Sequence, residues 1–221
     1  MNQMIRIWDL PTRIFHWALV ACVAGLVFTA EFAYMEWHFR LGYAVLALLL
    51  FRLVWGFVGG RWSRFSSFTY PPATLWRYLK GQSTPEQLAG HTPTGALSVF
   101  TLLLLLLAQV LSGTLSDDEA GASGPFTAWV SSAVVEKATW YHSEVGKAIL
   151  IVLVILHVAA IAYYRWRKGS NLLMPMLTGD KALPSALPPA RDDKRTRLRA
   201  LVVLMMVVGL VLALLKLSPT A

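Results

Sequence analysis

The sequence predicts an all-α membrane protein with five spanning helices. Of its 221 residues, 56% are hydrophobic and only 14% are charged, where a soluble domain carries about 25%. Five apolar runs each approach the roughly 20 residues that a helix needs to cross a bilayer. Nine Trp and seven Tyr suit a chain with two membrane–water interfaces to anchor.

The five apolar runs are spread along the whole chain. They are Leu10–Ala30, His38–Val58, Gly95–Leu115, His142–Tyr164 and Leu198–Leu217. We expect them to cross the membrane as consecutive antiparallel helices. The first is long for a signal peptide and lacks a good cleavage site, so we expect an uncleaved first span.

The segments between the spans differ in composition. The loop after the second span contains YPPATLWRYLKG, in which two prolines precede an amphipathic pattern, so we expect a short interfacial helix there. The loop after the third span is acidic, and Phe126–Val135 behind it is a candidate for a second interfacial helix. Residues 166–197 are basic and Pro-rich, which indicates a solvated cytoplasmic linker.

Lys and Arg are distributed unequally between the two sides. The N-terminal arm, the second loop and the fourth loop share one side and hold two, four and nine of the 20 Lys and Arg residues. The positive-inside rule therefore predicts a cytoplasmic N-terminus and a C-terminus on the outer side of the membrane. Basic loops account for the net charge of +8, so we expect no nucleic-acid partner.

Five histidines are the main candidates for chemistry. His142 and His157 lie fifteen residues apart on the fourth span, an axial rise of about 22 Å. A histidine inside a membrane helix is energetically costly and is usually functional. The topology places His16 at the depth of His157 near the inner face, and His38 at the depth of His142 near the outer face. The fifth, His91, lies at the inner end of the third span.

Two histidine pairs at different depths are suited to hold two stacked haem groups, because a haem iron can take one axial ligand from each of two helices. No Cys-x-x-Cys-His motif occurs, so covalent attachment is not expected. Gly42 and Gly146 follow His38 and His142 by four residues. They lie on the faces of their histidines, where a missing side chain lets a flat macrocycle approach.

Three arginines lie where a haem propionate would be a natural partner. Arg13 precedes His16 by three residues, Arg40 is close to His38, and Arg52 lies within the second span. For Arg52, snorkelling to the inner interface is the alternative interpretation.

His91 has two interpretations. It could replace His16 as the inner ligand, although Pro93 indicates that the helix starts after it. We favour a capping role or an inner-face quinone site, with Arg77 and the interfacial helix as further candidates. The stretch Phe126–Val135 is a candidate quinone site at the outer face.

Several motifs resemble the bacterial cytochrome b561 and nickel–iron hydrogenase b-type cytochrome family. They are WDLPTRIFHW, WHFRLGYAVLALLLFRLVWGFVGG, RFSSF, GHTPTGAL and HSEVGKAILIVLVILHVAAIAY. The resemblance implies a four-helix core in residues 1–165 that binds two non-covalent haem b groups. His16 and His157 match the axial ligands of the inner haem, and His38 and His142 match those of the outer haem. The fifth helix, within residues 198–221, fits the hydrogenase-like branch better than the four-helix members.

The resemblance also implies an electron-transfer protein of a respiratory chain. Its partners would be membrane lipid, quinone and a periplasmic redox protein, either a hydrogenase or a soluble c-type cytochrome. Two alternatives stay open: a haem-containing membrane anchor for a periplasmic enzyme, and a haem-free proton-coupled transporter. The sequence leaves open whether the chain is an oxidoreductase subunit acting with quinone and whether it forms a homo-oligomer.

Overall fold

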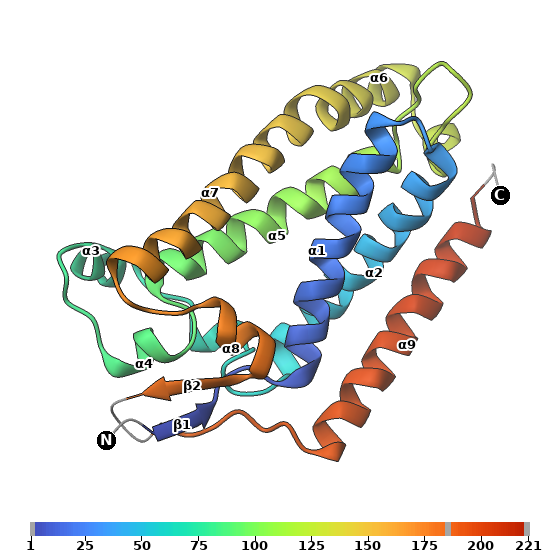
Figure 1. The fold of residues 1–221 in the computed structure, drawn as a ribbon. Helices are drawn as coiled ribbons and strands as arrows, with labels where there is room; N and C mark the ends of the chain where they lie inside the picture. The colour runs from blue at the N-terminus through green and yellow to red at the C-terminus, as the bar shows by residue number, and fades with distance from the viewer. Residues whose placement is uncertain (1–2, 184–186, 219–221) are drawn as a thin grey trace. The chain divides into compact units, whose positions relative to one another are not determined.

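The computed structural model describes residues 3–183 and 187–218 and is mostly helical (Figure 1). Residues 184–186 of the predicted linker and 219–221 of the predicted C-terminal segment lie outside the described residues. Within the described residues, five helical segments are long and apolar enough to cross a membrane. They are α1 (Leu10–Glu31), α2 (Met35–Val58), α5 (Pro93–Gly113), the continuous segment Ser132–Arg167 and α9 (Lys194–Lys216). The predicted fold class is therefore confirmed.

The segment Ser132–Arg167 changes helix type along its length. It consists of α6 (Ser132–Trp140), the π-helix η3 (Tyr141–Gly146) and α7 (Lys147–Arg167). It therefore begins ten residues earlier than the span predicted from His142. The stretch Phe126–Val135 is not one helix, because extended backbone at positions 130 and 131 separates the 3₁₀ turn η2 (Thr127–Trp129) from α6.

Short elements occupy the other loops. They are β1 (Gln3–Arg6), η1 (Phe65–Ser67), α3 (Pro72–Leu79), α4 (Pro85–Ala89), α8 (Leu173–Thr178) and β2 (Asp180–Leu183). The amphipathic α3 lies in the YPPATLWRYLKG sequence that predicts it. A capping box between Thr84 and Gln87 starts α4, which the sequence analysis did not foresee.

The chain forms two compact units, each assembled from three stretches. The first unit consists of Met1–His16, Arg52–Thr101 and Leu156–Val203, and the second of Trp17–Phe51, Leu102–Ile155 and Leu204–Ala221. The core of the first unit includes Ile5, Ile7, Trp8, Trp62, Ala89, Leu183 and Ala190. That of the second includes Val45, Leu49, Leu106, Val110 and Leu150. The first unit contains the histidines at positions 16, 91 and 157, and the second contains those at positions 38 and 142.

A buried carboxylate fixes the start of α1 in the first unit. Asp9 is 0% exposed, and its Oδ1 accepts the N–H of Thr12, which caps the first turn. The same carboxylate accepts from Ser63 Oγ at 2.8 Å and from Trp55 Nε1 at 3.4 Å. These bonds tie α1 to the end of α2 and to the loop that follows it.

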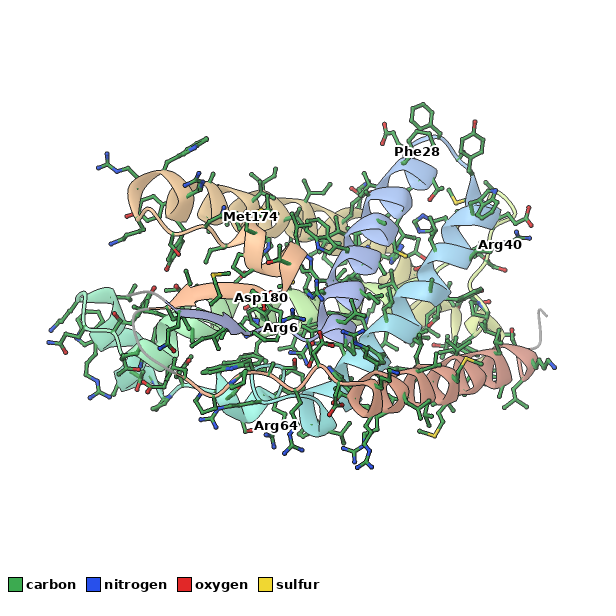
Figure 2. The ribbon with its side chains drawn as sticks, turned by 60° about the horizontal axis from the view of Figure 1, so that its bottom comes forward. Arg6, Phe28, Arg40, Arg64, Met174 and Asp180 are labelled. Carbon is green, nitrogen blue, oxygen red and sulfur yellow. The ribbon has the colours of Figure 1, made fainter. Side chains whose placement is uncertain are left out.

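The N-terminal strand pairs with the segment that we expected to be a solvated linker. β1 and β2 are antiparallel, with Gln3 opposite Leu183 and Arg6 opposite Asp180. Arg6 Nε lies 2.6 Å from Asp180 Oδ1, and Figure 2 shows the two residues side by side. Arg6 Nη1 also lies 2.6 Å from Asp192 Oδ2. Residues 166–197 therefore include α8 and β2 and are joined to the N-terminus by ion pairs.

Replacing Asp192 with Asn is expected to lower the free energy of unfolding by about 1–3 kcal/mol, because the carboxylate is 6% exposed and accepts bonds from Arg6, Arg197 and the Leu10 N–H. Burial raises the pKa of Asp192, but the hydrogen bonds from Arg197, Leu10 and Arg6 outweigh burial and hold this pKa below its usual value. The stabilisation is therefore present above the unfolded-state pKa of about 4 and is lost as pH falls through the folded-state pKa.

Thermal unfolding in detergent at pH 7 and pH 3 measures both effects. Asp193→Asn is the matched control, because Asp193 accepts the Thr196 N–H at the start of α9 and Asn caps helices equally well. Equal destabilisation by the two substitutions would contradict the prediction.

Candidate functional site

His38 of α2 and His142 of η3 meet in the second unit. Their ring centroids are 6.1 Å apart, and the ring planes are perpendicular at 90°. Both side chains are half-buried. The structure therefore brings together the two residues that were predicted as the outer pair.

Each ring of this pair is bound to a backbone carbonyl through Nδ1. His38 Nδ1 lies 3.1 Å from Leu26 O of α1 and 3.3 Å from Thr29 Oγ1. His142 Nδ1 lies 2.8 Å from Gln109 O of α5. A carbonyl oxygen can only accept, so Nδ1 carries the proton in both rings and each Nε2 keeps its lone pair. This is the tautomer that a metal-ligating histidine needs.

Local irregularities in the chain position both histidines. The turn between α1 and α2 is closed by the Tyr34 N–H, which donates to Thr29 O at 2.8 Å, and it places Ala33 at a left-handed φ of 57°. This tight turn brings the first residues of α2 back to the last turns of α1. His142 lies in a π-helix, a feature that is frequent at functional sites.

Two residues of α5 that the sequence analysis missed support His142. Gln109 Nε2 donates to the His142 backbone carbonyl at 2.7 Å. A Cβ atom at Gly113 would lie 2.7 Å from Cε1 of the His142 ring, so only glycine fits there. The sequence feature that could have identified Gln109 is its single amide in the apolar run LLLLLLAQVLSG. No comparable feature distinguishes Gly113.

The predicted haem-packing glycines have different surroundings. A Cβ atom at Gly42 would have nothing within 4 Å, which leaves the face beside His38 open. A Cβ atom at Gly146 would lie 2.0 Å from Gln109 Oε1. The space above Gly146 is thus filled by the Gln109 amide.

His16 of α1 and His157 of α7 belong to the first unit and lie near enough to interact electrostatically. His91 also lies near His16. The structure thus brings the predicted inner pair into one region and places His91 in the same region. Both His16 and His91 therefore stay candidates for the partner of His157.

The His91 ring is enclosed by aromatic side chains just before α5. Its centroid lies 4.7 Å from that of Trp8 and 4.2 Å from that of Phe68. Burial, with the nearby charges of Arg52 and Lys181, lowers the pKa of His91 to about 3, so the ring is neutral. Its Nδ1 is buried and has no hydrogen-bond partner among the described residues.

The three predicted propionate ligands differ in what they contact. Arg52 is 3% exposed, its guanidinium lies 4.7 Å from the centre of the Phe65 ring, and its buried Nη1 has no hydrogen-bond partner among the described residues. Arg13 donates to Leu177 O at 2.6 Å and lies 3.9 Å from Asp192, and its buried Nε has no hydrogen-bond partner among the described residues. Arg40 is exposed and paired with Glu36 on its own helix. Arg52 is therefore the most deeply buried of the three cations, with Asp9 as the carboxylate that acts on its charge.

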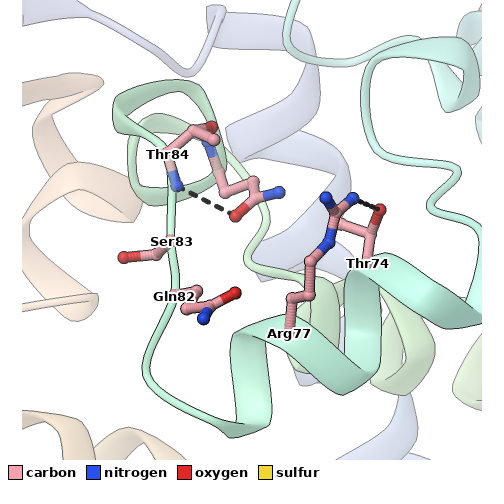
Figure 3. Close-up of a pocket in the computed structure, with 6 residues that line it drawn as sticks. Thr74, Arg77, Gln82, Ser83 and Thr84 are labelled. Atoms are coloured by element: carbon pink, nitrogen blue, oxygen red, sulfur yellow. Dashed lines mark hydrogen bonds between the residues drawn. The ribbon is translucent and has the colours of Figure 1, made fainter.

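Arg77 lies apart from these groups, on α3. Its Nη2 donates to Thr74 Oγ1 at 3.3 Å beside a surface pocket (Figure 3). The pocket is lined by Thr74, Arg77, Gln82, Ser83, Thr84 and Gln87. No described contact joins Arg77 to His91.

Five apolar helical segments and histidines with open Nε2 atoms define a membrane protein equipped to ligate a metal-containing cofactor. The chain belongs to the prokaryotic cytochrome b561 family, whose model matches residues 7–179. It is therefore a multi-pass membrane cytochrome of the b type, which implies haem b.

Similar proteins carry related names. The probable Ni/Fe-hydrogenase 1 B-type cytochrome subunit of Escherichia coli (strain K12) is 28% identical over 139 residues, which cover 48% of this chain and 57% of that protein. The chain thus spans less than two thirds of that relative. The probable Ni/Fe-hydrogenase B-type cytochrome subunits of Rhizobium leguminosarum and Bradyrhizobium diazoefficiens are 22% and 23% identical, and the matches cover 81% and 80% of this chain and 90% and 85% of theirs. No solved structure matches the chain.

The outer pair fits the haem that the family implies. Metal–imidazole bonds of about 2 Å, with each ring centre roughly 1 Å beyond its nitrogen, separate two axial imidazole centres by about 6 Å. The 6.1 Å between His38 and His142 agrees with this spacing. Both Nε2 atoms are available, and Gly42 leaves room beside His38.

Replacing Arg52 with Gln is expected to lower the midpoint potential of a haem whose propionate Arg52 binds. Removal of a buried positive charge favours the oxidised iron, by about 1 kcal/mol or some tens of millivolts. A spectroscopic redox titration of the purified haem-containing protein measures the shift relative to the wild type. The exposed Arg64→Gln is the control, and equal shifts for both substitutions would exclude a specific role for Arg52.

Proposed function

We propose that this chain is a di-haem b-type cytochrome that transfers electrons between the membrane quinone pool and a periplasmic redox partner. His16 and His157 hold the inner haem, and His38 and His142 hold the outer haem. The single observation that carries this proposal is the outer pair, with its 6.1 Å ring separation and both Nε2 atoms open. Residues 1–165 form the haem-binding core, residues 166–193 the cytoplasmic connection and α9 (Lys194–Lys216) the fifth helix.

The residues around the sites bind and orient the cofactors. A haem with two axial imidazoles supplies one-electron chemistry and leaves no open position for oxygen. Leu26 O and Gln109 O hold the outer rings in the ligating tautomer. Arg52 supplies a buried cation for a propionate, and Arg13 and Arg40 are weaker candidates because other groups already bind them.

The names of the relatives support a hydrogenase-like periplasmic partner, with a small c-type cytochrome as the other candidate. For quinone we propose the inner region around His91, a neutral ring with an open Nδ1. Arg77 and α3 are secondary inner candidates. The stretch Phe126–Val135, where Phe126 and Trp129 stack at 4.9 Å, is the outer one.

The distribution of Lys and Arg supports an orientation in the bacterial inner membrane with the N-terminus in the cytoplasm and the C-terminus in the periplasm. The side of quinone binding then decides whether turnover is electrogenic, because a charge that crosses the membrane gains or loses about 2.3 kcal/mol per 100 mV. We expect the complex with the partner to form in the membrane, with a homo-oligomer as one possible assembly.

Two other functions remain to be tested against this one. In a membrane anchor for a periplasmic enzyme, the haems would be structural and quinol would not reduce them. A proton-coupled transporter with histidine relays would contain no haem. An absorption spectrum of the purified protein and its reduction by a quinol analogue distinguish the three.

Replacing His157 with Ala is expected to remove the inner haem, because one of its two axial ligands is lost. Haem content should fall from two per chain to one, measured by the pyridine haemochrome assay. His91→Leu is the comparison variant and should retain two haems if His16 is the inner ligand. Loss of one haem in His91→Leu but not in a His16→Leu variant would reassign the inner ligand to His91.

Reduction by a quinol analogue tests the quinone assignment. We expect the wild-type protein to be reduced, and His91→Leu to be reduced at least about tenfold more slowly at equal haem content. The reason is that losing one hydrogen bond to a group that is charged or becomes charged costs about 1.5–3 kcal/mol. Stopped-flow absorbance gives the rates, with Arg64→Gln as the control. Unchanged reduction rates in His91→Leu would exclude His91 from the quinone site and favour Arg77 with α3 or the stretch Phe126–Val135.

A further inference from the structure

The imidazole of His142 is held to α5 by a reciprocal pair of hydrogen bonds. Gln109 Nε2 donates to the backbone carbonyl of His142 at 2.7 Å, and His142 Nδ1 donates to the backbone carbonyl of Gln109 at 2.8 Å. Both bonds join the same two residues. The main chain and the ring of His142 are therefore fixed together against one turn of α5.

Two glycines leave room for this pair of bonds. A Cβ atom at Gly113 would lie 2.7 Å from Cε1 and 3.0 Å from Nδ1 of the His142 ring. A Cβ atom at Gly146 would lie 2.0 Å from Gln109 Oε1. These separations are too short for real contacts, so a side chain at either glycine would displace the ring or the amide that holds it.

The plane of the His142 imidazole lies at a defined angle to the plane of the His38 imidazole. His38 is oriented by Leu26 O of α1, and His142 is oriented by Gln109 O of α5. With these two anchors the ring planes lie at 90°. The π-helix η3 places the His142 backbone where the Gln109 amide can reach it.

We propose that Gln109, Gly113 and Gly146 are positioning residues that keep the His142 imidazole perpendicular to that of His38 and thereby set the electronic state of the outer haem. This rests on the proposed function, because it takes both histidines as axial ligands. In ferric haems with two imidazole ligands, perpendicular ring planes give a highly anisotropic low-spin electron paramagnetic resonance (EPR) signal. Nearly parallel planes give a rhombic signal with a smaller maximum g value. Hydrogen bonding to an axial histidine also tunes the midpoint potential.

The test compares Gln109→Met, Gly113→Ala and Gly146→Ala in the purified haem-containing protein. Gln109→Met keeps the side-chain length and removes the amide donor, so it tests the hydrogen bond without adding bulk. The control is Leu111→Ala, which changes an exposed side chain on the same stretch of α5. EPR spectra and redox titrations are recorded for each protein, with haem content as the measure of intact folding.

We expect wild type and Leu111→Ala to show the highly anisotropic signal for the outer haem. Gln109→Met and Gly146→Ala should shift its maximum g value downward and move its midpoint potential, while the inner haem keeps both properties. Gly113→Ala, which pushes directly on the ring, should show the largest change or lose the outer haem alone.

Two results would overturn the inference. One is a rhombic outer-haem signal in the wild type, and the other is an unchanged signal and potential in Gln109→Met and Gly146→Ala at two haems per chain. A wild-type preparation without haem would instead reject the proposed function, so the two failures are distinguishable.

Discussion

An imidazole that ligates a metal inside a membrane must keep one nitrogen open and give the proton on the other nitrogen an acceptor. A buried donor without a partner costs about 1–3 kcal/mol, and apolar helices offer mainly their own backbone carbonyls as acceptors. A carbonyl has two lone pairs, so one that already closes a helical turn can accept a second bond. The second unit meets the requirement in this way, with Leu26 O for His38 and Gln109 O for His142.

Much of the local structure of the second unit gives these two rings their acceptors. The tight turn with Ala33 in the left-handed region returns α2 to α1, so that His38 reaches Leu26. On the other side of the pair, the π-helix exposes the His142 carbonyl to the Gln109 amide. Gly113 and Gly146 give the ring and the amide their space. Irregular backbone here serves the orientation of two side chains.

The first unit is organised around buried charge. Asp9 has hydrogen-bond donors on both carboxylate oxygens, whereas the buried Arg52 rests on an aromatic ring and keeps Nη1 without a hydrogen bond among the described residues. The difference favours an anionic group as a further partner of Arg52. His91, neutral and enclosed by Trp8 and Phe68, adds a polar atom to the same region without adding charge.

The sequence by itself determined the class and the five spans, and it predicted the pairing of His38 with His142 that the structure shows. These depend on local properties: the length of an apolar run, the cost of an imidazole within it and the bias of basic residues between loops. It could not assign Gly146, which was expected to face a macrocycle and instead lies against the Gln109 amide. Nor could it show that Asp192 accepts from Arg6, or that β1 pairs with β2, since these partners are far apart in the chain. The orientation of His142 was decided only by the tertiary structure, because its acceptor and the glycine beneath its ring lie on another helix.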